Sequence, residues 1–312
     1  MSRIPARLSI AAVTAVTLAF VAGCNEKVVG PGNPVEAEAR LFAAMNTDDF
    51  AAAGDIVGQF YEIRDKDPEN HRNTFLLGAA SLWWLAEASH PGANPLQITG
   101  QAIPLILESF VDVIQNDPVN RPGANALLGA FLSDAGFDRA QGAALIEMAV
   151  AEKPEVGLFQ RMHIRRFAFA DDLETAVAVD AGFKFWELCA GGIALDRANP
   201  DFTAHVKQPT NDDMARFCWG SERVPHGYEG AWLIFGDLLV KSGDIAAAQR
   251  AYLNATLGPN FDRWRYKSEI TQRLASDLNA RRATYASRYA EQWAPIGVPA
   301  FSCTQCHASV AQ

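Results

Sequence analysis

The C-terminal end of the chain carries the residues best suited to chemistry: two cysteines and a histidine at Cys303, Cys306 and His307. They form the pattern C-x-x-C-H, which is the attachment sequence of c-type haem. In that arrangement the two thiols form thioethers with the haem vinyl groups, and the imidazole is the proximal ligand of the iron. We therefore expect one covalent haem c, attached through Cys303 and Cys306 and ligated by His307.

The same three residues allow two other interpretations. Cys303 and Cys306 can form a local disulfide or dithiol pair, and together with His307 and one further ligand they can bind a metal ion. Haem attachment is favoured because cysteine and histidine are scarce, with 5 and 6 copies in 312 residues, so chance rarely produces this pattern.

The second axial ligand of the iron has no sequence signature. Our first choice is His226 and our second is Met214. Both lie in residues 191–228, an irregular stretch with a double glycine and several prolines that can fold over a haem. Loops of this length in a compact domain are usually functional or disordered. His205 lies in the same stretch and is a further candidate.

Met162 and His163 are weaker candidates, because they belong to a stretch expected to form a helix. For Met162 the simpler interpretation is packing, and for His163 it is a solvated polar side chain. Three arginines share this stretch and can pair with haem propionates, although a solvated helix face is the simpler explanation. They are Arg161, Arg165 and Arg166.

The N-terminal residues have the features of an export signal. Arg3 and Arg7 precede an apolar run at residues 8–22, which is too short for a convincing membrane span. The run ends in Val-Ala-Gly-Cys at Cys24, and this ending resembles the lipobox of bacterial lipoproteins. An ordinary secretory peptide is the alternative interpretation.

The lipobox resemblance implies that residues 1–23 are a signal peptide and that Cys24 is lipidated. Residues 24–34, which are rich in Gly and Pro, are then a flexible tether to the membrane. The resemblance also implies a location in the cell envelope on the periplasmic side. In that family an Asp after the cysteine favours the inner membrane, so Asn25 favours the outer membrane.

Composition excludes some classes of function. The chain is 49% hydrophobic and 20% charged, which is ordinary for a globular protein, and its net charge is −9. A nucleic-acid partner is not expected, because phosphate binding requires a basic surface. Phosphate-binding glycine loops and a nucleophile elbow are also absent from the sequence, so a hydrolase, kinase or nucleotide-binding site is not expected.

Two cysteines remain after lipidation and haem attachment, namely Cys189 and Cys218. Unpaired thiols are unusual in the oxidising periplasm, so their simplest fate is a disulfide. Closing a loop of about 30 residues contributes about 3 kcal/mol in the chain-entropy estimate. Two inert buried thiols are the alternative.

Helical patterns separated by proline stops run through the chain and predict an all-α fold. Asp or Asn before proline recurs at Asp67, Asp117 and Asn199 and ends a helix each time, and Lys153-Pro154 and Gly258-Pro259 have the same effect. Regular stops between amphipathic helices indicate stacked helical hairpins.

Residues 231–259 closely resemble a tetratricopeptide (TPR) repeat. Small residues allow two helices to approach, large ones fill the space between them, and the sequence Lys-Ser-Gly-Asp at 241–244 forms the turn. The residues that match the repeat are Trp232, Phe235, Gly236, Leu239, Ala248, Tyr252 and Ala255. Residues 125–154 form a weaker copy with Gly129 and Ile146, and a third copy surrounds Gly78.

The TPR resemblance implies a helical solenoid over residues 35–293, with residues 191–228 as an irregular insertion. We expect a long capping helix over residues 260–293, followed by a short haem-bearing tail at 294–312. TPR surfaces bind proteins, so a protein partner and a redox partner are implied. Electron transfer is the expected function. A scaffolding lipoprotein, and a haem enzyme or gas sensor with an open distal site, are the alternatives.

Overall fold

The computed structural model describes residues 33–47, 49–89, 92–134, 138–164, 173–206, 218, 227–258, 261–264 and 267–287. Every regular element in these ranges is a helix, so the expected all-α fold is confirmed. None of the helices in them is long and apolar enough to cross a membrane. The α-helices are α1 (Pro34–Thr47), α2 (Ala53–Lys66), α3 (His71–Ala86), α4 (Pro95–Asn116), α5 (Arg121–Asp134), α6 (Arg139–Glu152), α7 (Pro154–Ile164), α8 (Leu173–Cys189), α10 (Gly227–Ser242), α11 (Ile245–Ala255), α12 (Lys267–Ala275) and α13 (Leu278–Ser287).

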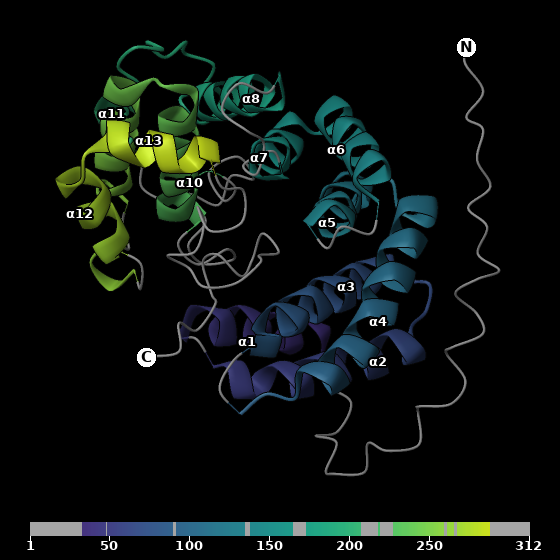
Figure 1. The fold of residues 1–312 in the computed structure, drawn as a ribbon. Coiled ribbons are helices and arrows are strands. Elements are labelled where there is room, and N and C mark those ends of the chain that lie inside the picture. The colour runs from purple at the N-terminus through teal and green to yellow at the C-terminus, as the bar shows by residue number, and fades with distance from the viewer. Residues whose placement is uncertain are drawn as a thin grey trace, which may run out of the picture.

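Each helix packs mainly on its neighbours in the sequence. The most extensive pairings join α3 with α4, α5 with α6, and α10 with α11. In Figure 1 the helices follow an arc, with α1–α4 at the bottom, α5 and α6 on the right, and α7, α8 and α10–α13 across the top. Three helix breaks fall where prolines predict them, because α2 ends before Asp67-Pro68, α4 before Asp117-Pro118, and α7 begins at Pro154. The helix end expected at Asn199-Pro200 is wrong, because α8 already ends at Cys189.

A glycine in the first helix of three hairpins lies against the second helix. A Cβ atom added to Gly236 would lie 2.3 Å from Cε1 of Tyr252. The same construction at Gly129 meets Ile146 Cγ1 at 2.7 Å, and at Gly78 it meets Phe110 Cε1 at 2.8 Å. These distances are too short for a real side chain, so glycine permits the close approach of the two helices.

The expected long helix over residues 260–293 is wrong for the part that the structure describes. A 3₁₀ turn at Phe261–Arg263 precedes α12, and Ser276 and Asp277 separate α12 from α13. The Ser276 hydroxyl donates to the carbonyl of Arg273, while the Asp277 carboxylate accepts from the amides of Asn279 and Ala280. Asp277 therefore acts as an N-cap that starts a new helix.

Within the described ranges the apolar core consists of three clusters. One lies among α1, α2 and α3, and a second among α3, α4 and α5. The third and largest extends from α7 to α13 and includes Trp186, Trp232 and Trp264. The two ends of the arc are therefore stabilised separately, and most of the aromatic burial lies in the C-terminal part.

Candidate functional site

Most of the predicted site residues lie outside the described ranges. This applies to Cys24, to Cys303, Cys306 and His307 of the haem motif, and to the distal candidates Met214 and His226. Within the described ranges, no group of three or more His, Cys, Asp or Glu side chains is arranged to hold a metal ion. The haem site and the lipidation site therefore remain predictions.

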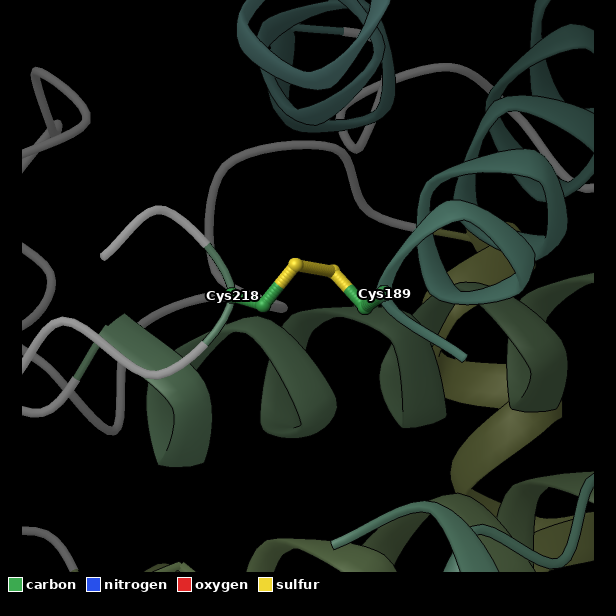
Figure 2. The surroundings of a disulfide bond; sticks show 2 residues. All are labelled: Cys189 and Cys218. Atoms are coloured by element: carbon green, nitrogen blue, oxygen red, sulfur yellow. A yellow bond between two sulfur atoms is a disulfide. The ribbon is translucent and has the colours of Figure 1, made fainter. Parts of the chain in front are cut away.

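A disulfide joins Cys189 at the end of α8 to Cys218 (Figure 2). Its Cα–Cα distance is 5.6 Å, and both residues are buried in the C-terminal apolar cluster. This is the pairing that the cysteine count favours. The bond closes a loop of 29 residues, which corresponds to about 3–4 kcal/mol of stabilisation in the chain-entropy estimate.

The first part of the irregular stretch is attached to α11. The Asn254 side chain accepts a hydrogen bond from the Phe202 amide at 3.2 Å and donates one to the Pro200 carbonyl at 2.6 Å. On the same helix, Arg250 donates to the Asn199 side chain at 3.0 Å. Because the Asn254 bonds are buried, they hold residues 199–202 in a defined position despite the lack of regular structure.

His205 ends the 3₁₀ turn that follows this attachment. Its ring lies 5.4 Å from that of Phe202, and the side chain is half-buried. His205 is thus the one distal-ligand candidate of the irregular stretch whose position is described. Within the described ranges it has no neighbouring set of ligands that would form a metal site.

The side chains of Met162 and His163 are fully buried on α7. Burial of Met162, which lies against Gly182 of α8, agrees with the packing interpretation. For His163 the expected solvated environment is wrong, because its ring lies 5.9 Å from that of Phe159 in a stacked arrangement. Arg161 forms an ion pair with Glu147 of α6 and so joins α6 to α7.

Two tryptophans form the centre of the C-terminal aromatic cluster. The rings of Trp186 in α8 and Trp232 in α10 are 3.9 Å apart and inclined by only 7°. Phe202 and Tyr228 meet both indoles edge-on, at angles between 62° and 79°. Burial, together with the charge of Glu229, raises the pKa of Tyr228 well above its ordinary value.

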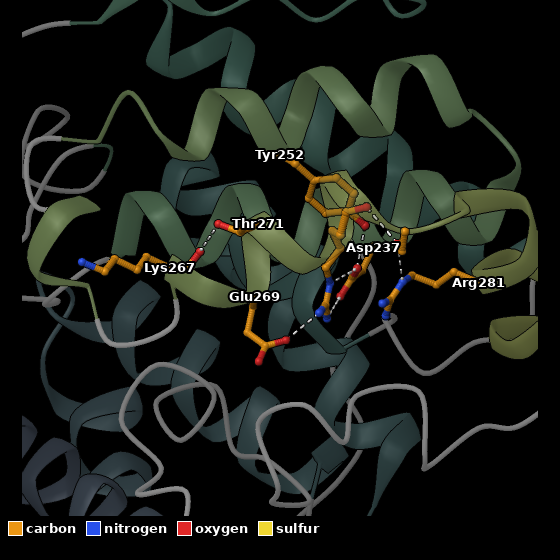
Figure 3. A network of polar contacts seen from close by, with 8 residues as sticks. Asp237, Tyr252, Lys267, Glu269, Thr271 and Arg281 are labelled. Carbon is orange, nitrogen blue, oxygen red and sulfur yellow. Dashed lines mark hydrogen bonds and ion pairs between the residues drawn. The ribbon is translucent and has the colours of Figure 1, made fainter.

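A buried ionic network joins α10, α11 and α12 (Figure 3). The Arg273 guanidinium donates to both carboxylate oxygens of Asp237 at 3.1 Å and to Glu269 at 2.6 Å. Tyr252 donates to the same Asp237 carboxylate at 2.7 Å. Arg273 and Asp237 are 1% and 2% exposed, so this bidentate pair lies in the core. Because each of these charged groups has a hydrogen-bond partner, the network is suited to holding α12 in place.

Sequence reasoning did not identify this network. Glu269 and Arg273 are spaced i,i+4, which in a charged helix usually indicates a solvated surface pair. One available signal was Asp237, the single charged residue of the run 230–240 in α10, because a buried carboxylate requires a partner.

A shallow, open depression of about 550 Å³ lies between the α2–α3 and α4–α5 turns. His71 forms part of its lining, with Nδ1 2.8 Å from Asp112 Oδ2, and Asn116 donates to the other oxygen of Asp112. Asp117 accepts from the Asn120 side chain and from the amides of Val119 and Asn120. These polar groups bond mainly to each other within the turns, so the depression is explained as part of the local structure.

Comparison with models of protein families, with curated protein sequences and with solved structures finds no significant match to this chain. The inference of function therefore depends on the motifs of the sequence and on the geometry described above.

Proposed function

We propose that this chain is a lipid-anchored, periplasm-facing protein that carries one c-type haem and exchanges electrons with a partner complex. The observation that carries the proposal is the C-x-x-C-H sequence at Cys303, Cys306 and His307. Cys303 and Cys306 hold the haem through thioethers, and His307 is the proximal ligand. The bound haem supplies a one-electron Fe(III)/Fe(II) couple.

Two further features support this placement. The lipobox-like ending at Cys24 directs the chain out of the cytoplasm, where c-type haem is attached. The Cys189–Cys218 disulfide fits the same oxidising compartment. The donor set of two thiols and one imidazole is chemically suited to haem, whereas a tetrahedral metal site needs a fourth ligand.

The scaffold in this proposal is a TPR-like stack of helical hairpins over residues 35–293. Its support is the recurrence of a close-approach glycine at Gly78, Gly129 and Gly236, each facing a large side chain of the next helix. In Figure 1 the first helix of each of these hairpins lies nearer the inside of the arc. Such an arc can recruit a protein partner. In the proposal the haem tail at 294–312 follows this scaffold.

Haem maturation tests the proposal directly. The full chain is expressed with a c-type haem maturation system, and we expect a haem-stained band in denaturing gels and the spectrum of a pyridine haemochrome. The Cys303→Ala/Cys306→Ala variant controls for adventitious haem and should lose both signals. A matured wild-type sample without covalent haem contradicts the proposal.

A second candidate function is a scaffolding lipoprotein without a functional haem, and the helical hairpins favour it. Cys303→Ala distinguishes the two candidates. If partner binding and the partner-dependent phenotype persist in this variant, the scaffold is the main function. If electron transfer is lost while partner binding persists, electron transfer through the haem is the main function.

Membrane attachment is tested separately through Cys24. Wild type is expected in the membrane fraction with a lipid-modified N-terminal peptide, whereas Cys24→Ala should lack the modification. An unmodified Cys24 in the wild-type protein contradicts the lipoprotein assignment and leaves the haem proposal untouched.

A further inference from the structure

We propose that the stacked pair of Trp186 and Trp232 is a redox-active unit, which gives up one electron more readily than the other tryptophans and so serves as a buried electron relay. This inference depends on the geometry of α8 and α10 and not on the presence of haem.

The geometry of the pair is the first argument. Aromatic rings in proteins usually meet edge-on or offset, because their quadrupoles repel in a direct face-to-face arrangement. Phe202 and Tyr228 follow that preference against both indoles. Trp186 and Trp232 do not, since their rings are nearly parallel and 3.9 Å apart. At this separation the two π-systems overlap, so a positive charge on one ring is shared with the other. Sharing the charge makes removal of one electron easier than from a single indole.

Electrostatics of the surroundings is the second argument. Glu229 lies one helical turn before Trp232 and is fully buried. A carboxylate in a medium of low dielectric constant attracts a positive charge strongly. The oxidised pair is therefore favoured relative to the neutral pair.

The fate of the proton is the third argument. Nε1 of Trp186 is buried and has no hydrogen-bond partner within the part of the chain that the structure describes. Because an indole nitrogen can only donate, its proton has no acceptor there to move to. Tyr228, beside Trp232, stays a neutral phenol because its pKa is raised, and a phenol oxygen is too weak a base to take the indole proton. Oxidation therefore removes one electron and no proton, leaving a radical cation shared by two rings. The oxidant gains that electron, and a one-electron donor later restores the neutral pair.

Further aromatic rings surround the pair. Phe185 lies 4.8 Å from Trp186, and Phe202 lies between the pair and the half-buried His205. The Fe(III)/Fe(II) couple of the proposed function is too weak to oxidise an indole, so the relay would serve a strong one-electron oxidant supplied by a partner. The test uses an external oxidant instead, so failure of the relay and failure of the haem proposal remain distinguishable.

The experiment is flash photolysis of the full-length protein with tris(bipyridine)ruthenium and an irreversible electron acceptor, which generates ruthenium(III). We expect the transient spectrum of a protonated tryptophan radical cation together with a near-infrared charge-resonance band, which arises only from a stacked pair. Trp186→Phe and Trp232→Phe should each lose the near-infrared band. Trp83→Phe is the matched control, because Trp83 is equally buried in another apolar cluster, and it should retain the band.

A measurement on wild type alone covers the case in which a tryptophan variant fails to fold. After prolonged photolysis, mass spectrometry should locate the oxidation products at Trp186 and Trp232 in preference to the more accessible Trp84. Absence of the near-infrared band in wild type overturns the proposal. Products that accumulate first at Trp84 overturn it as well.

Discussion

Helices α3–α5 and helices α10–α12 differ in how they bury part of their polar groups. In α3–α5 several buried side-chain atoms have no hydrogen-bond partner within the part of the chain that the structure describes, namely Asn73 Nδ2, Thr74 Oγ1, Ser81 Oγ, Ser109 Oγ and both polar atoms of Asn125. In α10–α12 the buried charges of Asp237, Glu269 and Arg273 bond to one another. An unpartnered buried polar group costs free energy that a satisfied network avoids. The Asp237–Glu269–Arg273 network should therefore stabilise α10–α12 more than these polar groups stabilise α3–α5.

Equivalent positions in the hairpins illustrate this difference. Trp232 lies four residues before Gly236 and fills the space between α8 and α10. The residues four positions before Gly129 and Gly78 are Asn125 and Thr74. Small polar side chains thus occupy the N-terminal hairpins where the C-terminal hairpin has a large aromatic ring. The matching glycines preserve the backbone geometry in all three hairpins, while side-chain packing at this position stabilises the N-terminal hairpins less than the C-terminal one.

The largest expected effect comes from breaking the buried network. Arg273→Met leaves the carboxylates of Asp237 and Glu269 buried without their cation, so we expect the free energy of unfolding to fall by about 3–5 kcal/mol. Arg282→Met is the control, because Arg282 is an exposed residue of α13. It should cost about 0–1 kcal/mol. Denaturant titration followed by circular dichroism measures both, and equal losses in the two variants would contradict the role assigned to the network.

The same substitution at two asparagines should have opposite effects in the two parts. Asn254→Leu leaves the Phe202 amide and the Pro200 carbonyl without their partners, so we expect a loss of about 2–4 kcal/mol. Asn125→Leu removes a buried amide whose nitrogen and oxygen are both unpartnered within the described ranges, and it should raise stability by about 1 kcal/mol. Denaturant midpoints of the two variants provide the comparison, and a destabilised Asn125→Leu would contradict it.

Alanine at the close-approach glycines tests how tightly each hairpin is packed. Gly236→Ala should cost about 1–3 kcal/mol, because the added methyl group meets a Tyr252 ring whose hydroxyl is bonded to Asp237. Gly129→Ala meets the carbonyl of Gly142 at 2.7 Å, which only a backbone shift can relieve. Gly78→Ala should cost least, since the Phe110 ring can rotate away.

The control for this series is Gly58→Ala. Gly58 is an exposed residue of α2 with no atom within 4 Å of an added Cβ. Alanine there should stabilise the protein by about 0.5–1 kcal/mol, because it reduces the entropy of the unfolded chain. Thermal melts of the four variants give the ranking. A ranking in which Gly78→Ala is the most costly would reverse the inferred order of packing.

These comparisons also show which features the sequence could predict. Helix ends at Asp67, Asp117 and Lys153 follow from proline chemistry, which acts within a few residues. The positions of the close-approach glycines follow from the spacing of small and large residues within each hairpin. By contrast, the sequence did not predict the break at Ser276-Asp277. The apolar face of the expected long helix continues across the break, and only the hydrogen bonds of the Ser276 and Asp277 side chains mark it.

Features that depend on distant elements were not predictable from local patterns. The stacking of Trp186 on Trp232 requires α8 and α10 to be adjacent, although the irregular stretch separates them in sequence. Burial of Arg273 similarly depends on where α12 packs. The haem motif, by contrast, is local, because Cys303, Cys306 and His307 define its chemistry without any distant element. Haem attachment itself stays a prediction that haem maturation tests.

The smallest expected effect concerns two aspartates with different partners. In α8, hydrogen bonds and attraction from Lys184 and Arg197 outweigh partial burial and lower the pKa of Asp180. At the α4–α5 turn, burial alone would raise the pKa of Asp117. Hydrogen bonds from the Asn120 side chain and from two backbone amides have a larger, opposite effect, so the net pKa is below the ordinary value. Both groups thus stabilise the fold at pH values above the ordinary aspartate pKa. This contribution is lost as the pH falls through the lower pKa of the folded state.

Salt should separate the two aspartates, because mobile ions screen charges but not hydrogen bonds between neutral groups and a carboxylate. In a carboxyl-detected NMR titration, molar salt should move the pKa of Asp180 upward, toward its ordinary value. The pKa of Asp117 should change less, since its principal donors are an amide side chain and the backbone. Equal shifts at the two sites would mean that the charge of His71 and the wider field, rather than the turn, hold the Asp117 pKa down.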